Sequence, residues 1–156
     1  AVGVAQLARL DEFVAIQKRN YTILREALSS IPEVVFRTVP DGGEENHSFL
    51  NFFLPNGDIA KKAHQALSDG GVDGCFYWYD NNWHYYKKWE HLTEMKSLGK
   101  LPKDVIDSLP DYSKADFSAS DKWMSRNISC LIKLGWTEEE VAERASKMVE
   151  AVRAVV

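Results

Sequence analysis

The sequence predicts an α+β fold, in which a small sheet packs between a long N-terminal helix and a C-terminal helix. Two apolar stripes predict the helices, because apolar residues recur three and four positions apart over 4–29 and again over 137–156. Between them, short runs of β-branched and aromatic residues are separated by Gly- and Pro-containing turns. These runs predict a sheet of about three to four strands, either antiparallel or mixed.

The helix over 4–29 would be about 39 Å long at roughly 1.5 Å per residue, which is longer than a compact domain of this size needs. The residues before it, Ala1, Val2 and Gly3, include no typical N-cap. A long helix without a cap is typical of a segment that bridges two structural units. The sequence therefore predicts that these residues form a small domain of a larger protein.

The strands are expected on either side of one helix that begins near Asp58, its predicted cap, and ends before Gly70. The apolar run 128–134 is compatible with a strand or a helical turn. Thr137 and Glu140 form a capping-box pattern for the closing helix. The three clearest strand candidates are 33–39, 47–54 and 72–77, of which 47–54 is apolar enough for burial on both faces.

One domain is predicted over 1–156, and the middle of the chain is expected to be its least regular part. Short helical pieces are expected over 88–98 and 103–109, with a polar surface loop over 111–121. The predicted parts are an interdomain helix (1–30), a sheet with one helix (31–80), an irregular substrate-facing segment (81–121) and a closing strand and helix (122–156).

Composition excludes several classes of partner. The net charge of −4 gives no broad basic face for nucleic acid, and no apolar run approaches the roughly 20 residues that span a bilayer. The first ten residues do not resemble a signal peptide. Cys75 and Cys130 match no metal-site spacing, and we expect two buried thiols in a reducing compartment, with a single bridge left open. A cytoplasmic protein without a metal is predicted.

Aromatic residues concentrate in the segment 76–90, whose sequence is FYWYDNNWHYYKKWE. Flat rings stack on sugar rings or planar cofactors, and the amides and ammonium groups between them hydrogen-bond hydroxyls or anions. Core packing is the alternative, but no single packing period accounts for eight aromatics among so many polar groups. We therefore predict a binding surface here, a subunit interface included.

Other reactive side chains have weaker patterns. His47 and His64 are isolated in the sequence, and structural or surface roles are expected for both. His84 and His91 are seven residues apart, which is wider than the usual spacing of a metal-binding pair. A solvated or phosphate-facing role is expected for the lysine pair 87–88 rather than covalent catalysis.

Four segments, in order, are similar to the small domain of the DegT/StrS-type sugar aminotransferases, which depend on pyridoxal 5'-phosphate (PLP). AVGVAQLARLD at 1–11 resembles the AAVGVAQLxxLD pattern, and HSFLNFFLP at 47–55 resembles a strand that opens with His and aromatics. The segment 71–84 resembles the stretch that approaches the active site, and ISCLIKLGWTEEEV at 128–141 resembles the closing strand and helix start. NNWHYYKKW replaces the usual PLH, and SCLIK replaces SLP, which indicates an unusual branch.

The resemblance implies the small domain of a fold-type I PLP enzyme that moves an amino group from glutamate to a keto sugar. That sugar would be a nucleotide-linked (GDP-linked) 4-keto sugar or an eight-carbon keto sugar acid. The Schiff-base lysine and most PLP contacts would lie in an N-terminal large domain, so the present chain alone would be inactive. A homodimer is implied for the full-length protein.

By the same analogy, the substrate-pocket candidates are Trp78, Tyr79, Trp83 and His84. Arg126 is the candidate for bidentate pairing with the carboxylate of glutamate, and a surface salt bridge is its alternative role. Three alternatives to an aminotransferase stay open. They are a keto-deoxysugar 3-dehydratase of the same fold, a free-standing carbohydrate-binding module and a dimerisation module.

Overall fold

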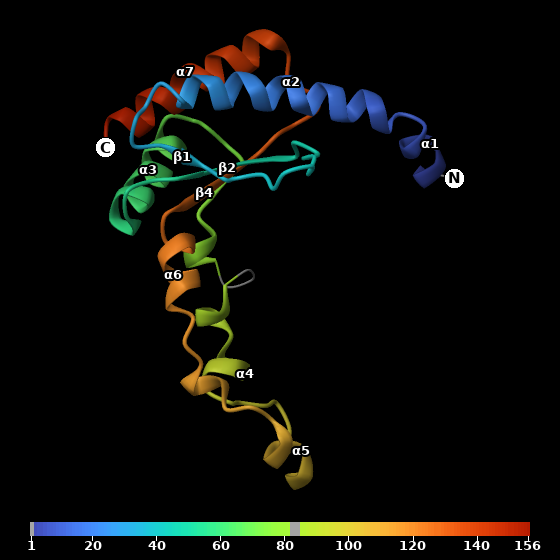
Figure 1. Ribbon diagram of the computed structural model, residues 1–156, viewed down its shortest axis with the longest axis vertical. Coiled ribbons are helices and arrows are strands. Elements are labelled where there is room, and N and C mark those ends of the chain that lie inside the picture. The colour runs from blue at the N-terminus through green and yellow to red at the C-terminus, as the bar shows by residue number, and fades with distance from the viewer. Residues whose placement is uncertain (1, 82–84) are drawn as a thin grey trace.

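The structure is a computed structural model that describes residues 2–81 and 85–156. Its centre is a four-stranded antiparallel sheet in the order β1-β2-β4-β3. Helices α2, α3 and α7 cover one face of this sheet, and a narrow arm, residues 85–124, extends away from its other side (Figure 1). The α+β prediction is confirmed, and the sheet is antiparallel rather than mixed.

The predicted N-terminal helix is two helices, α1 (Val2–Leu7) and α2 (Leu10–Leu28). The backbone leaves the helical region at Arg9, whose guanidinium pairs with Glu12 in the first turn of α2 at 2.9 Å. Helix α1 buries no residue, so no packing energy holds it in line with α2. The apolar stripe itself is confirmed over α2, where Leu24 and Leu28 are fully buried.

The four strands are shorter than the sequence predicted. They are β1 (Val35–Phe36), β2 (Phe49–Phe53), β3 (Cys75–Phe76) and β4 (Asn127–Leu131). The ambiguous run after residue 127 is therefore a strand, and it lies between β2 and β3 at the centre of the sheet. Pairing of β4 with β2 joins Leu50 to Cys130 and Phe52 to Ile128.

Helix α3 (Gly57–Asp69) is capped by Asn56, whose side-chain oxygen accepts the Ile59 N–H at 2.9 Å. The prediction of Asp58 as the cap is wrong, because Asp58 lies in the first turn, where its charge favours the helix N-terminus. Helix α7 (Glu138–Arg153) has the predicted capping box of Thr137 and Glu140.

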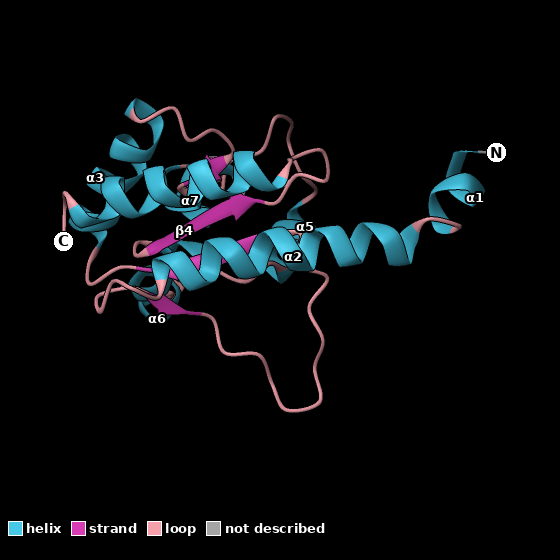
Figure 2. Cartoon of the chain, turned by 90° about the horizontal axis from the view of Figure 1, so that it is seen from above, coloured by secondary structure: helices cyan, strands magenta, loops and turns pink. Residues whose placement is uncertain are grey.

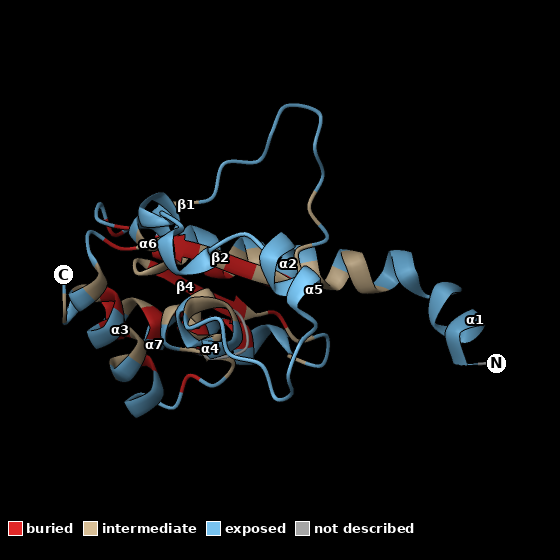
Figure 3. Cartoon of the chain, turned by 90° about the horizontal axis from the view of Figure 1, so that it is seen from below, coloured by how far each residue is buried: buried red, intermediate tan, exposed pale blue. Residues whose placement is uncertain are grey.

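The core lies between the sheet and its three helices, where Figure 3 shows the buried residues gathered. β2 contributes Leu50 and Phe52 to the core, whereas Phe49, Asn51 and Phe53 on its other face are half-buried. The prediction that this strand is buried on both faces is therefore wrong within this chain. Only the face of β2 that the helices cover is buried.

The remaining elements are short. The 3-10 helix η1 (Trp78–Asp80) follows β3, and the arm contains η2 (Tyr86–Lys88), α4 (Glu90–Thr93), α5 (Lys103–Ser108), η3 (Tyr112–Lys114) and α6 (Ser118–Met124). The stretch predicted as a loop after 111 thus contains η3 and the start of α6. Residues 37–48 connect β1 to β2 as a wide loop (Figure 2). Among the described helices, none combines the length and apolarity needed to cross a bilayer.

Candidate functional site

The face of the sheet away from the helices carries polar groups among aromatic rings. Because side chains alternate along a strand, Asn51 of β2 and Ser129 of β4 share this face with Phe49 and Phe76. Ser129 Oγ lies 2.5 Å from Asn51 Oδ1 and 3.0 Å from Asn127 Oδ1. Asn127 Nδ2 in turn donates to the Phe52 carbonyl at 3.3 Å. This network fixes the amide of Asn51 at the centre of the exposed face.

A pocket of about 460 Å³ lies over this face, and we call it the sheet-face pocket. Its lining includes residues of the β1–β2 loop and Trp78. Its size and its mixture of rings, amides and hydroxyls suit a polar organic molecule. The lining residues are Arg37, Glu45, Asn46, His47, Ser48, Phe49, Asn51, Trp78 and Ser129.

His47 holds an unusual backbone conformation at the edge of this pocket. Its φ of 59° lies in the left-handed region, which costs a non-glycine residue about 1–3 kcal/mol. Its ring meets Tyr21 edge-on with centroids 4.9 Å apart, and its Nδ1 is buried without a hydrogen-bond partner among the described residues. Such strain is concentrated at functional sites. The sequence predicts a structural or surface role for His47, and the His-aromatic opening of the strand is the one feature that marks its position.

The charges at the rim are partly balanced. Glu45 pairs with Arg37, and Tyr21 donates its hydroxyl to Glu45 at 3.2 Å. Burial and the nearby Glu45 carboxylate raise the pKa of Tyr21, which therefore stays a neutral donor. The rim of the pocket thus carries the guanidinium of Arg37, whose positive charge is partly neutralised by the Glu45 carboxylate.

Trp78 lies in this pocket as a stacking surface. Its indole is parallel to the ring of Phe76, with centroids 4.6 Å apart and an interplanar angle of 7°. The structure therefore brings Trp78, a residue singled out from the sequence, together with His47, Asn51 and Ser129.

Tyr79 lies in a different group at the base of the arm, with Tyr85, Lys87 and Asp121. Lys87 Nζ contacts Tyr79 Oη at 2.9 Å and Asp121 at 3.0 Å, and Tyr85 donates its hydroxyl to Asp121. The bonds to Tyr79 and Asp121 raise the pKa of Lys87, so its amine is held as a cation. Burial raises the pKa of Tyr85 well above its usual value. This group fixes the arm and offers no neutral amine for covalent chemistry.

Arg126 precedes β4, at the end of the sheet where β2 finishes. Its Nε donates to the Leu54 carbonyl at 2.6 Å, and its guanidinium lies over Trp123 at 5.3 Å from the ring centroid. Trp123 meets Phe53 edge-on at 5.4 Å. No ion pair in the described part of the chain uses Arg126, so its alternative role in a surface salt bridge is not seen there. The candidates Trp83 and His84 lie outside the described residues.

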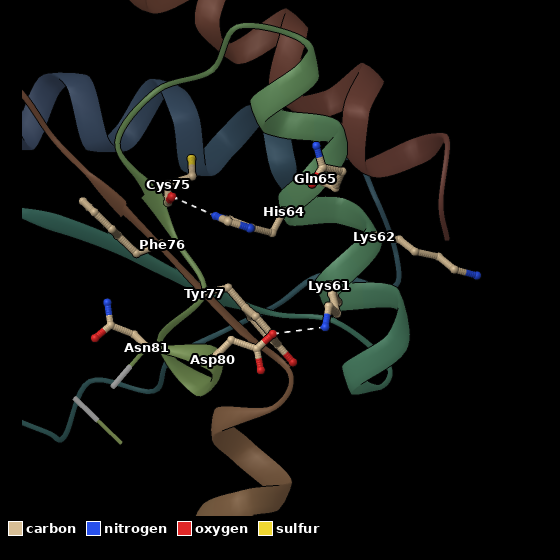
Figure 4. A pocket seen from close by; sticks show the side chains of 9 residues that line it. All are labelled: Lys61, Lys62, His64, Gln65, Cys75, Phe76, Tyr77, Asp80 and Asn81. Atoms are coloured by element: carbon tan, nitrogen blue, oxygen red, sulfur yellow. Dashed lines mark hydrogen bonds and ion pairs between the residues drawn. The ribbon is translucent and has the colours of Figure 1, made fainter. Parts of the chain in front are cut away.

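A second pocket of about 590 Å³ lies between α3 and β3, and we call it the α3 pocket (Figure 4). Lys61 of α3 pairs with Asp80 at 3.2 Å across its mouth, and His64 Nε2 donates to the Cys75 carbonyl at 3.1 Å. Both partners of the Lys61–Asp80 pair are at least half exposed. This pocket has a solvated ion pair at its rim and the half-buried residue Cys75 in its lining.

A PLP site requires a lysine amine that can lose its proton and a charged partner for the pyridine nitrogen. Neither pocket of the described residues combines these groups. No lysine lines the sheet-face pocket. The α3 pocket is lined by Lys61 and Lys62, which are both exposed, and its carboxylate, that of Asp80, is already paired with Lys61. Within the described residues, neither of these two pockets therefore fits a complete PLP site.

The chain is similar to known proteins in sequence and in fold. Residues 1–106 match the model of the DegT/DnrJ/EryC1/StrS aminotransferase family. The crystal structure of an aminotransferase, TlmJ from Streptoalloteichus hindustanus, is similar with a TM-score of 0.65 and 16% identity over 99% of this chain. The structure of 3-amino-5-hydroxybenzoic acid synthase is similar with a TM-score of 0.53 and 21% identity over 96%.

The chain spans only 36% and 37% of the lengths of those two proteins. At these identities the two structures establish the fold, and the sequence match establishes the relationship. Since that match covers more than half of the residues, the chain belongs to the DegT/DnrJ/EryC1/StrS aminotransferase family.

Proposed function

We propose that residues 1–156 are the C-terminal small domain of a PLP-dependent aminotransferase that moves an amino group from glutamate to a keto sugar. The observation that carries the proposal is the family match over 1–106, joined to a fold that covers 36–37% of each similar structure. The keto sugar would be a nucleotide-linked 4-keto sugar or an eight-carbon keto sugar acid.

The sheet-face pocket would form the wall of the substrate site. The stacked rings of Trp78 and Phe76 offer a flat apolar surface for one face of a sugar ring. Asn51, Ser129 and His47 offer donors and acceptors for its hydroxyl groups. Trp83 and His84 remain sequence-based candidates for the same wall, and Tyr79 would act by fixing the base of the arm.

Arg126 would bind a carboxylate of glutamate. Its Nε is occupied by the Leu54 carbonyl, and this bond together with the Trp123 contact orients the guanidinium. The two Nη groups form no hydrogen bond in the described part of the chain and match the two oxygens of a carboxylate.

The cofactor would be held mainly by residues outside this chain. PLP supplies the electron sink for amino transfer when it is bound, and this domain would orient the sugar and exclude water. A large domain would cover the exposed sheet face, the full-length protein would be a homodimer, and the isolated domain would be inactive.

Reduction of the full-length protein with borohydride in the presence of PLP tests whether the lysine that binds the cofactor lies outside residues 1–156. We expect the cofactor to become fixed to a lysine outside 1–156, as located by peptide mapping. Fixation to Lys61, Lys87 or Lys88, or to no lysine, would contradict the proposal. Product analysis separates the related dehydratase, which releases a deoxy sugar that contains no nitrogen from glutamate.

A further inference from the structure

Cys75 of β3 and Cys130 of β4 lie directly opposite each other in the sheet. At the neighbouring pair, the Leu131 N–H donates to the Gly74 carbonyl at 2.9 Å. Because hydrogen-bonded and non-hydrogen-bonded pairs alternate along an antiparallel ladder, the two cysteines occupy a non-hydrogen-bonded pair. Cα atoms of such pairs are about 4.5 Å apart, which is within the range of about 4.4–6.8 Å found for disulfides.

The side chains also meet. The two Sγ atoms are 2.6 Å apart, and both thiols are free. A disulfide bond of about 2.05 Å therefore needs the sulfurs to approach by roughly half an ångström. We propose that Cys75 and Cys130 are a thiol-oxidation site, at which a reversible disulfide joins β3 to β4. This inference does not depend on the proposed function.

The two thiols differ in access and in acidity. Cys75 is half-buried and is one of the residues that line the α3 pocket (Figure 4), whereas Cys130 is fully buried. The hydrogen bond with Cys130 and the charge of Arg144, whose Nη2 is 4.0 Å from Cys75 Sγ, lower the pKa of Cys75. Burial raises the pKa of Cys130. Cys75 is thus the attacking thiol, and Cys130 completes the bond.

The oxidant would be a small disulfide such as oxidised glutathione. The Cys75 thiolate attacks one sulfur of that disulfide, whose S–S bond breaks and releases the first glutathione thiolate. The sulfur of Cys130 then attacks Cys75 Sγ and releases the second. The two glutathione thiolates take up the two protons that the cysteines lose, so glutathione is reduced and the protein is oxidised by two electrons.

The bond would act on the segment that holds the substrate-pocket candidates. β3 leads directly into Trp78, and the chain between the two cysteines contains the whole arm. A disulfide that closes this loop restricts the unfolded chain and fixes β3 to the central strand. Oxidation should therefore raise the Tm by roughly 5–10 °C.

Incubation of the folded full-length protein with oxidised glutathione tests the site. Trypsin would release Cys75 in the peptide 63–87 and Cys130 in the peptide 127–133. We expect the two peptides to appear as one linked species that has lost two hydrogens, and dithiothreitol should separate them. Free thiols at both positions after exposure to oxidised glutathione or diamide would overturn the proposal, as would a persistent glutathione adduct on Cys75.

Single variants establish the order of the two steps. Cys130→Ala should accumulate the glutathione adduct on Cys75, whereas Cys75→Ser should leave Cys130 unmodified because it is buried. Circular dichroism verifies that each variant is folded. The peptide map of the wild-type protein tests the disulfide without either variant. That test therefore still holds if a variant does not fold.

Discussion

The indole of Trp78 lies parallel to the ring of Phe76, with centroids 4.6 Å apart, whereas Tyr77 between them packs toward Tyr79 at 6.0 Å. Residues two apart along an extended chain point to the same side. The aromatic segment therefore divides between two places. Phe76 and Trp78 lie on the exposed sheet face, and Tyr77 and Tyr79 lie at the base of the arm. This division explains why no single packing period fits the segment.

Trp78→Ala should weaken binding of the keto sugar by the full-length enzyme. Loss of a stacking surface worth about 0.5–1.5 kcal/mol predicts a KM for the sugar roughly 2- to 13-fold higher, with the KM for glutamate unchanged. Trp78→Phe should retain most of the affinity. Tyr112→Ala, which removes an exposed aromatic of the arm, is the matched control. An unchanged KM for the sugar in Trp78→Ala would show that Trp78 does not bind the sugar.

Arg126→Lys tests the carboxylate role without removing a positive charge. Lysine cannot form the planar two-bond contact of a guanidinium, so we predict a KM for glutamate about 10-fold higher in steady-state assays. The KM for the sugar should change little. Arg153→Lys, at the far end of α7, serves as the control. Equal effects of the two variants on the glutamate KM would exclude the role.

Leu50→Ala should destabilise the domain far more than Leu98→Ala. Leu50 is fully buried between the sheet and its helices, and removing its side chain costs about 2–5 kcal/mol of unfolding free energy. Leu98 is fully exposed on the arm, so its loss should be nearly neutral. Urea unfolding monitored by circular dichroism gives both values. A loss of unfolding free energy in Leu98→Ala comparable to that in Leu50→Ala would contradict the exposed position of Leu98 on the arm.

Asp73 should make stability depend on pH in the acid range. Hydrogen bonds from Lys133 and Arg144 lower the pKa of Asp73 below its ordinary 3.8. A lowered folded-state pKa stabilises the protein above the unfolded value, and the contribution disappears as the pH falls through the folded value. Asp73→Asn should therefore lower the Tm at pH 7, and the difference from wild type should shrink by pH 3. A difference that stays constant with pH would contradict this assignment.

The helices at the two ends could be predicted because their signals are local. The stripe of α2 and the capping box of Thr137 and Glu140 are complete within a few turns of chain. The sequence predicts the wrong cap for α3 because Asn56 and Asp58 are both good capping residues, and only the folded backbone and side chain of Asn56 distinguish them. The position of β4 depends on pairing with strands far away in the sequence, which no local pattern encodes.

The sheet-face pocket was only partly predictable for the same reason. Trp78 belongs to a composition bias that is visible in the sequence. Asn51 and Ser129 are 78 residues apart and become partners only through the β2–β4 register. A single amide inside the apolar run HSFLNFFL was the one signal available for Asn51. His47 is marked by its positive φ, which only the folded chain reveals.

The assignment of a sugar aminotransferase is tested most directly by following nitrogen from ¹⁵N-labelled glutamate in the full-length, PLP-loaded protein. The acceptors to supply are a nucleotide-linked 4-keto sugar and an eight-carbon keto sugar acid. We predict that mass spectrometry finds ¹⁵N in one amino-sugar product, and that Trp78→Ala slows its formation at low sugar concentration. A sugar product that has lost a hydroxyl group and contains no ¹⁵N, or no turnover with either acceptor, would contradict the assignment.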